Sequence, residues 1–120
     1  MRCVVQRGKE ASVTVAGGTV GKIGPGYMVL IGVSVEDTEK DVRYMADKVP
    51  NLRIFEDAED KMNLSLKDVG GEILAVSQFT LYGDARGGRR PSFIAAARPE
   101  AANELYEQLV ASWREQGIHV

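Results

Sequence analysis

The stretch that decides the fold runs from residue 70 to residue 81 and reads Gly70-Gly71-Glu72-Ile73-Leu74-Ala75-Val76-Ser77-Gln78-Phe79-Thr80-Leu81. Two glycines punctuate its start, and the unbroken apolar run 73–76 predicts a buried β-strand. Polar side chains appear only after this run. Because successive side chains of a strand point to opposite faces, we expect Ser77 and Phe79 on one face and Gln78 and Thr80 on the other. The pattern is typical of a strand that ends in a site.

A glycine-rich loop follows this strand and holds three arginines within five residues, namely Arg86, Arg89 and Arg90. The whole chain carries a net charge of −2, so its overall field does not favour nucleic acid. A local cluster of this kind is either a solvated loop or a phosphate-binding site. The composition of the loop leaves both interpretations open.

The residues before the central stretch predict a group of short strands. Segments rich in β-branched residues are typical of antiparallel strands, and they lie at 3–7, 12–15 and 19–23. Gly17-Gly18 supplies a tight turn between the last two. Gly24-Pro25-Gly26 forces another turn, and the continuous apolar run 27–33 then predicts a central strand that is buried on both faces.

Two helices of more than ten residues are expected. The first is capped by Asp37 or Thr38 and terminated by Pro50, and its apolar stripe consists of Val42, Met45, Ala46 and Val49. The second starts at Pro99 and has Gly117 just beyond its end. Its apolar positions recur at helical spacing and anchor it on the sheet.

A further short strand is expected at 52–56, followed by an acidic turn at 57–60. The resulting order is strand-strand-strand-helix-strand-strand-helix. It predicts an α/β fold, in which a two-layer, mixed but largely antiparallel sheet carries both helices on one face. The other face stays partly open, and a second copy of the chain would cover it. We therefore expect a homodimer.

Composition narrows the class of protein. With 44% hydrophobic and 27% charged residues in 120, the chain suits a single globular domain over 1–120. No apolar run reaches membrane-spanning length and no secretory signal is present, so we expect a cytoplasmic protein. Cys3 and His119 are the only residues of their types, which argues against a zinc site and against a Ser-His-Asp triad. We expect no metal and no cofactor, and we interpret Cys3 as a small buried hydrophobe.

The central stretch resembles the Ser-Gln-Phe-Thr signature of the D-aminoacyl-tRNA deacylases, which stands here at 77–80. Four more blocks resemble the pattern of that family in the same order, and they lie at 4–7, 51–57, 61–65 and 88–93. A lone four-residue match would be weak evidence. Five ordered blocks cover essentially the whole chain and make a specific resemblance.

The resemblance implies hydrolysis of the ester between a D-amino acid and the terminal ribose of tRNA. It implies a homodimer with active sites at the interface, a tRNA partner, and no DNA or membrane. The catalytic pocket would be built by Ser77, Gln78, Phe79 and Thr80, while Arg86, Arg89 and Arg90 would hold tRNA phosphates. Arg7 is either a surface arginine or, by the resemblance, an anchor for a backbone segment at the active site.

Two chemical routes fit these residues. Ser77 or Thr80 would be a weak nucleophile without an adjacent base. The family is understood to use the 2′-hydroxyl of the terminal ribose to assist the attacking water, which removes the need for a side-chain base. The alternatives that remain are a non-catalytic tRNA-binding or oligomeric scaffold of the same fold, and a small-ester hydrolase with Thr80 as nucleophile.

Chains of this family continue past a position like Val120 with further strands and an Asn-x-Gly-Pro segment that rejects L-amino acids. No such segment is present, because the four prolines are Pro25, Pro50, Pro91 and Pro99. We expect residues 1–120 to form one deacylase domain without the C-terminal strands of the family, and we expect the intact enzyme to be longer.

Overall fold

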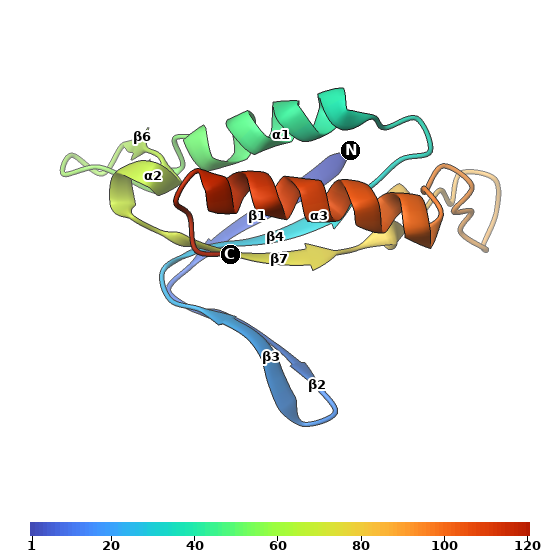
Figure 1. Ribbon diagram of the computed structural model, residues 1–120, viewed down its shortest axis with the longest axis horizontal. Helices are drawn as coiled ribbons and strands as arrows, with labels where there is room; N and C mark the ends of the chain where they lie inside the picture. Colours follow the sequence, from blue (N-terminus) through green and yellow to red (C-terminus); the bar gives the residue numbers. More distant parts are fainter.

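The computed structural model describes all 120 residues and has a sheet with two long helices on one face (Figure 1). The strands are β1 (Arg2–Gly8), β2 (Ala11–Val15), β3 (Gly18–Ile23), β4 (Gly26–Gly32), β5 (Phe55–Glu56), β6 (Met62–Leu64) and β7 (Glu72–Ser77). The helices are α1 (Glu39–Asn51), α2 (Leu66–Val69), the 3-10 turn η1 (Phe79–Tyr82) and α3 (Pro99–Glu115). The α/β fold class is confirmed, and all four strand segments predicted before the first helix are present, one more than the expected order of elements counted.

The main sheet has the order β1-β4-β7, so the apolar run after Gly26 does form the central strand. Strand β4 runs antiparallel to β1 and parallel to β7. Its residue Val29 lies opposite Val5 on one side and Ala75 on the other. The parallel pairing places the end of β7 beside the end of β4, where the polar residues of the signature begin.

The core lies between this sheet and helices α1 and α3. Tyr27 and Trp113 are fully buried, and the ring of Tyr27 stacks on Phe55 with centroids 5.4 Å apart. Burying a large apolar side chain contributes about 1.5–3 kcal/mol. The cluster consists of Tyr27, Val29, Ile31, Val42, Ala46, Val49, Leu66, Ile73, Leu109, Trp113 and Ile118. None of the helices has the length and apolar composition needed to cross a bilayer.

Strands β2 and β3 form a separate hairpin that projects from the sheet (Figure 1). The hairpin was predicted, but its turn lies one residue earlier than Gly17-Gly18. Ala16 and Gly17 both have positive φ, 51° and 80°, and they connect Val15 to Gly18. A two-residue turn with positive φ at both positions matches the twist of the flanking strands.

Helix α1 begins as predicted but does not end at Pro50. The Thr38 side chain accepts a hydrogen bond from the N–H of Lys40, and its capping box is completed by Asp41. Pro50 lies inside the helix, which continues to Asn51. Proline cannot donate to the carbonyl one turn earlier, that of Ala46. That carbonyl accepts instead from Gln116 Nε2 at 2.9 Å, so α3 supplies the missing donor.

The region between α1 and β7 differs most from expectation. The strand predicted at 52–56 is reduced to Phe55–Glu56, and the Ile54 carbonyl accepts a hydrogen bond from the Arg7 side chain at 2.7 Å. Helix α2 was not predicted. It is capped by Ser65, whose hydroxyl accepts from the N–H of Asp68, and it ends at Gly70 with φ 65°. A single helical turn is too short to leave an apolar period in the sequence.

Candidate functional site

The tip of β7 carries the signature residues, but the predicted alternation of their side chains is wrong. Strand β7 ends at Ser77, and Phe79 and Thr80 begin the 3-10 turn η1. The N–H of Gln78 still donates to the carbonyl of Ile31 at 2.8 Å. The N–H of Leu81 then donates back to the Gln78 carbonyl at 3.3 Å, which bends the chain into the turn. Helical geometry therefore replaces the two-residue period of a strand.

Two residues that sequence reasoning missed, Gly32 and Arg2, support this turn. A Cβ at Gly32 would lie 3.0 Å from the Leu81 Cβ and 3.2 Å from the Gln78 carbonyl, so the turn packs where only glycine leaves room. Arg2 is the register partner of Gly32 and donates from Nη1 to the Leu81 carbonyl at 2.7 Å. Its guanidinium lies 4.4 Å from the centre of the Tyr82 ring. In the sequence, the one signal for this close approach of η1 to β4 is a single glycine within an apolar strand.

A hollow of about 920 Å³ opens beside the turn. Ser77 and Phe79 line it from the tip of β7, and the first turn of α3 closes its other side. Phe79 meets Phe93 edge to face, with ring centroids 5.3 Å apart. The lining consists of Val35, Ser77, Phe79, Phe93, Ile94, Ala96, Ala97, Arg98, Pro99, Ala102 and Asn103.

Large apolar side chains around this hollow are left in contact with water. The exposed fractions are 59% for Val35, 57% for Phe79 and 88% for Ile94. Contiguous exposed apolar residues on a folded protein mark a surface that binds a ligand or another macromolecule. The position of this patch beside the signature residues makes it the candidate site.

The hydroxyls of Ser77 and Thr80 make no hydrogen bond to an acidic or basic side chain. The Thr80 hydroxyl accepts a hydrogen bond from the side-chain amide of Gln78, a group that cannot take up a proton. His119 lies at the opposite end of β7, with Nε2 3.9 Å from the Glu72 carboxylate. Glu72 and Ser77 are five strand residues apart, or about 16 Å. A Ser-His-Asp triad is therefore not assembled in this chain.

The arginine loop follows η1 in the chain, and backbone hydrogen bonds join its two ends. Asp84 and Ser92 exchange two backbone hydrogen bonds, of 2.8 and 2.7 Å. Arg86 is paired with Asp84 at 2.7 Å, and its hydrogen bonds lower the pKa of that carboxyl group. Arg89 and Arg90 are exposed and make no ion pair. The loop thus presents two free cations at its tip.

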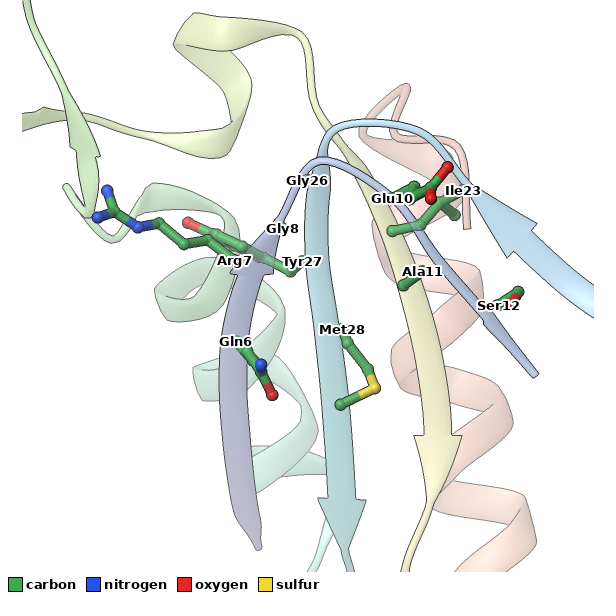
Figure 2. A pocket seen from close by; sticks show the side chains of 10 residues that line it. All are labelled: Gln6, Arg7, Gly8, Glu10, Ala11, Ser12, Ile23, Gly26, Tyr27 and Met28. Atoms are coloured by element: carbon green, nitrogen blue, oxygen red, sulfur yellow. The ribbon is translucent and has the colours of Figure 1, made fainter.

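The structure places Arg7 at the opposite end of the sheet from Ser77. Arg7 pairs with Tyr27 in the register, whereas Ser77 lies beside Ile31. Figure 2 shows Arg7 where β1 ends and β4 begins, with its guanidinium extended away from the hairpin. Besides its bond to the Ile54 carbonyl, it lies 3.5 Å from the Glu56 carboxylate. Arg7 does anchor a backbone segment, but one remote from Ser77 in the same chain.

The hollow beside Arg7 is smaller, about 250 Å³ (Figure 2). It lies at the mouth of the hairpin and lacks the exposed aromatic wall of the larger hollow. Cys3 is partly buried against the core, as interpreted from the sequence. Burial raises the pKa of its thiol to about 11, so the reactive thiolate is scarce at neutral pH.

Comparison with known proteins decides the family. The sequence profile described as D-Tyr-tRNA(Tyr) deacylase matches residues 4–120. The chain belongs to the D-Tyr-tRNA(Tyr) deacylase family. The resemblance drawn from the five blocks is thereby confirmed, and membership makes the protein a hydrolase.

Individual deacylases are closely similar to the chain. A D-aminoacyl-tRNA deacylase of Brevibacillus brevis is 63% identical over 120 residues, which is all of this chain and 83% of that protein. One from Thermus aquaticus is 59% identical over all of this chain and 79% of its own length. The chain therefore spans about four fifths of these relatives.

Solved structures also match the fold of this chain. A structure titled c-Myc DNA Unwinding Element Binding Protein has a TM-score of 0.91 and 43% identity, and the match covers 97% of this chain and 78% of that one. A probable eukaryotic D-amino acid tRNA deacylase has a TM-score of 0.78 over 94% of this chain and 66% of its own. Its identity is 24%, so this second match supports the fold alone.

Proposed function

We propose that the protein hydrolyses the ester of mischarged D-aminoacyl-tRNA and releases a free D-amino acid and tRNA. The observation that carries the proposal is that the signature residues 77–80, at the end of β7 and the start of η1, lie beside the 920 Å³ hollow in a chain of the deacylase family. Small-molecule sites are concave, largely apolar and about 300–1,000 Å³ in volume. The hollow therefore has the size and lining to receive the terminal nucleoside and its ester.

Backbone donors at the turn suit the charge that develops during ester hydrolysis. Phe79 and Thr80 are the first two residues of η1, so their N–H groups lack partners one turn earlier. Neither donates to another loop or cap of the chain. Fixed N–H donors of this kind stabilise a tetrahedral oxyanion, and removing one in a protease costs about 3 kcal/mol. We assign this role to Phe79 and Thr80.

We infer that the substrate supplies the assistance that the protein lacks. The terminal ribose carries a 2′-hydroxyl next to the ester, and a group held at that distance reaches a high effective concentration. In this scheme the 2′-hydroxyl orients and activates water, and Ser77, Gln78 and Thr80 shape the pocket. The pairing of Thr80 with an amide, and the distance of His119, support this route over a covalent one.

Replacing Thr80 by alanine tests which route operates. The variant keeps the backbone N–H, so we expect deacylation of D-Tyr-tRNA to fall by no more than about 10-fold, the effect of one neutral hydrogen bond. Single-turnover assays with the wild type and Thr80→Ser as controls measure this. Complete loss in Thr80→Ala with restored activity in Thr80→Ser, at equal tRNA binding, would identify a threonine nucleophile.

Arg89 and Arg90, the two loop arginines without an ion pair, are proposed to hold phosphates of the acceptor stem. We expect Arg89→Ala with Arg90→Ala to weaken tRNA binding and to reduce the slope of log K against log salt by about 1.8, since each phosphate contact contributes about 0.9. Fluorescence titration at several salt concentrations measures the slope. The matched control replaces the paired residues together, as Asp84→Asn with Arg86→Ala, because this removes the ion pair and leaves the net charge of the loop unchanged. A slope unchanged in the double variant would refute the assignment.

We further propose a homodimer formed through the face of the sheet that lacks helices. Side chains that alternate with the core positions point to this face, including Val4, which is 49% exposed, together with Met28, Leu30 and Val76. Such an apolar face favours burial against a second copy. In such a dimer, the distance from Arg7 of one protomer to the signature residues of its partner would differ from the distance within one chain. We place the reaction in the cytoplasm, where aminoacyl-tRNA is made.

Incubation with D-Tyr-tRNA and L-Tyr-tRNA tests the proposed function as a whole. The enzyme is expected to release D-tyrosine and to leave the L-ester largely intact. A scaffold of the same fold would bind both tRNAs and hydrolyse neither. The assay follows labelled tyrosine under conditions where the uncatalysed hydrolysis of both esters is measured in parallel.

A further inference from the structure

Arg98 is the one charged residue among those that line the hollow beside Ser77. It is exposed, and its side chain makes no hydrogen bond or ion pair within the chain. No carboxylate lies within 4 Å of it. A guanidinium that borders an apolar hollow without a partner is free to bind an anionic part of whatever enters.

The backbone that carries Arg98 is held in place by the end of β4. The N–H of Ala97 donates to the Val33 carbonyl at 2.8 Å, and the Ala95 carbonyl accepts from Val35 at 3.0 Å. The Arg98 carbonyl accepts the first hydrogen bond of α3, from Ala102 at 2.9 Å. Because Val33 follows the strand that seats η1, Arg98 and the signature turn share one rigid support.

We propose that Arg98 binds the phosphate that joins the last two nucleotides of tRNA. This inference rests on the proposed function, which places the ester at the turn and the terminal adenosine in the hollow. The ester lies on one side of the terminal ribose and this phosphate on the other, so a cation at the rim of the same hollow lies one ribose from the reacting atoms. Arginine offers a planar fork that matches a phosphate.

The three arginines would bind successive phosphates of the tRNA, starting at the ester. Phe93 lines the hollow, and its neighbour Ser92 closes the base of the arginine loop. Arg89 and Arg90 belong to that loop and do not line the hollow, whereas Arg98 does. Arg98 takes the phosphate nearest the ester, and the loop arginines take phosphates further upstream.

Substrates of increasing length separate these roles. The series consists of 3′-O-D-tyrosyl-adenosine, which has no phosphate, the D-tyrosyl ester of the dinucleotide CpA, which has one, and D-Tyr-tRNA. We expect Arg98→Ala to lower kcat/KM about 10-fold or more on CpA and tRNA, the effect of a hydrogen bond to a charged group, with no change on adenosine. Arg98→Lys should restore part of the loss, and Arg89→Ala should affect tRNA alone.

Binding of uncharged CpA and adenosine, measured by calorimetry, gives a second readout that needs no catalysis. Arg98→Ala is expected to weaken CpA binding and to leave adenosine binding unchanged. Equal losses on adenosine and CpA, or no loss on CpA, would overturn the role of Arg98 while leaving the proposed function in place. A wild-type protein that hydrolyses none of the three D-esters but binds CpA through Arg98 would instead overturn the proposed function alone.

Discussion

Replacing Gly26 by alanine is expected to disrupt the sheet, with a loss of at least about 3 kcal/mol in the free energy of unfolding. Gly26 is buried at the start of β4, with φ 156°, a region that only glycine enters easily. An added Cβ would lie 1.9 Å from the carbonyl oxygen of Glu72, its register partner in β7. The clash is with backbone, which cannot rotate away.

Chemical denaturation followed by circular dichroism measures this loss, and thermal unfolding should fall by about 10 °C or more. Gly18→Ala is the matched control, because a Cβ there would meet the Val15 carbonyl at an ordinary 3.6 Å. Equal stability of Gly26→Ala and Gly18→Ala would show that β4 and β7 do not approach as described.

Replacing Gly32 by valine is expected to lower the rate of deacylation by about 100-fold, the effect of a displacement near 1 Å at a reacting centre. Its side chain would push against Leu81 and the Gln78 carbonyl and displace the turn that carries Phe79 and Thr80. The backbone of Gly32 is not in the left-handed region, so the strand itself tolerates a side chain.

Single-turnover rates for Gly32→Ala and Gly32→Val should decrease in that order, because the added volume increases. Gly18→Val on the projecting hairpin is the control for a glycine-to-valine change. Rates equal to the wild type in a folded Gly32→Val variant would mean that the position of the turn does not depend on its close contact with Gly32.

Much of the fold could be predicted because its signals are local. The apolar run after Gly26 identified the central strand, and Thr38 and Pro99 marked the starts of α1 and α3. Caps and helix starts depend on side chains within a few residues of one another. The pattern of residues 70–81 placed a candidate site at the end of this strand, and the family resemblance added the roles expected of residues 77–80.

The errors arose where distant residues decide local structure. Pro50 would end an isolated helix, but Gln116 satisfies the carbonyl that proline leaves free. The signature residues continue a strand pattern in the sequence, but the space above Gly32 and the contact of Arg2 favour a turn. These contacts join residues 70 and 79 positions apart along the chain, beyond the reach of pattern reasoning.

The central claim is that tRNA itself assists hydrolysis at the turn after β7. The most direct measurement compares D-Tyr-tRNA that ends in adenosine, with tyrosine on the 3′-oxygen, with D-Tyr-tRNA that ends in 2′-deoxyadenosine. We expect the enzyme to bind both with similar affinity and to hydrolyse only the first above the uncatalysed rate. Equal enzymatic hydrolysis of the two esters would contradict the account, because the deoxy substrate lacks the hydroxyl on which the mechanism depends.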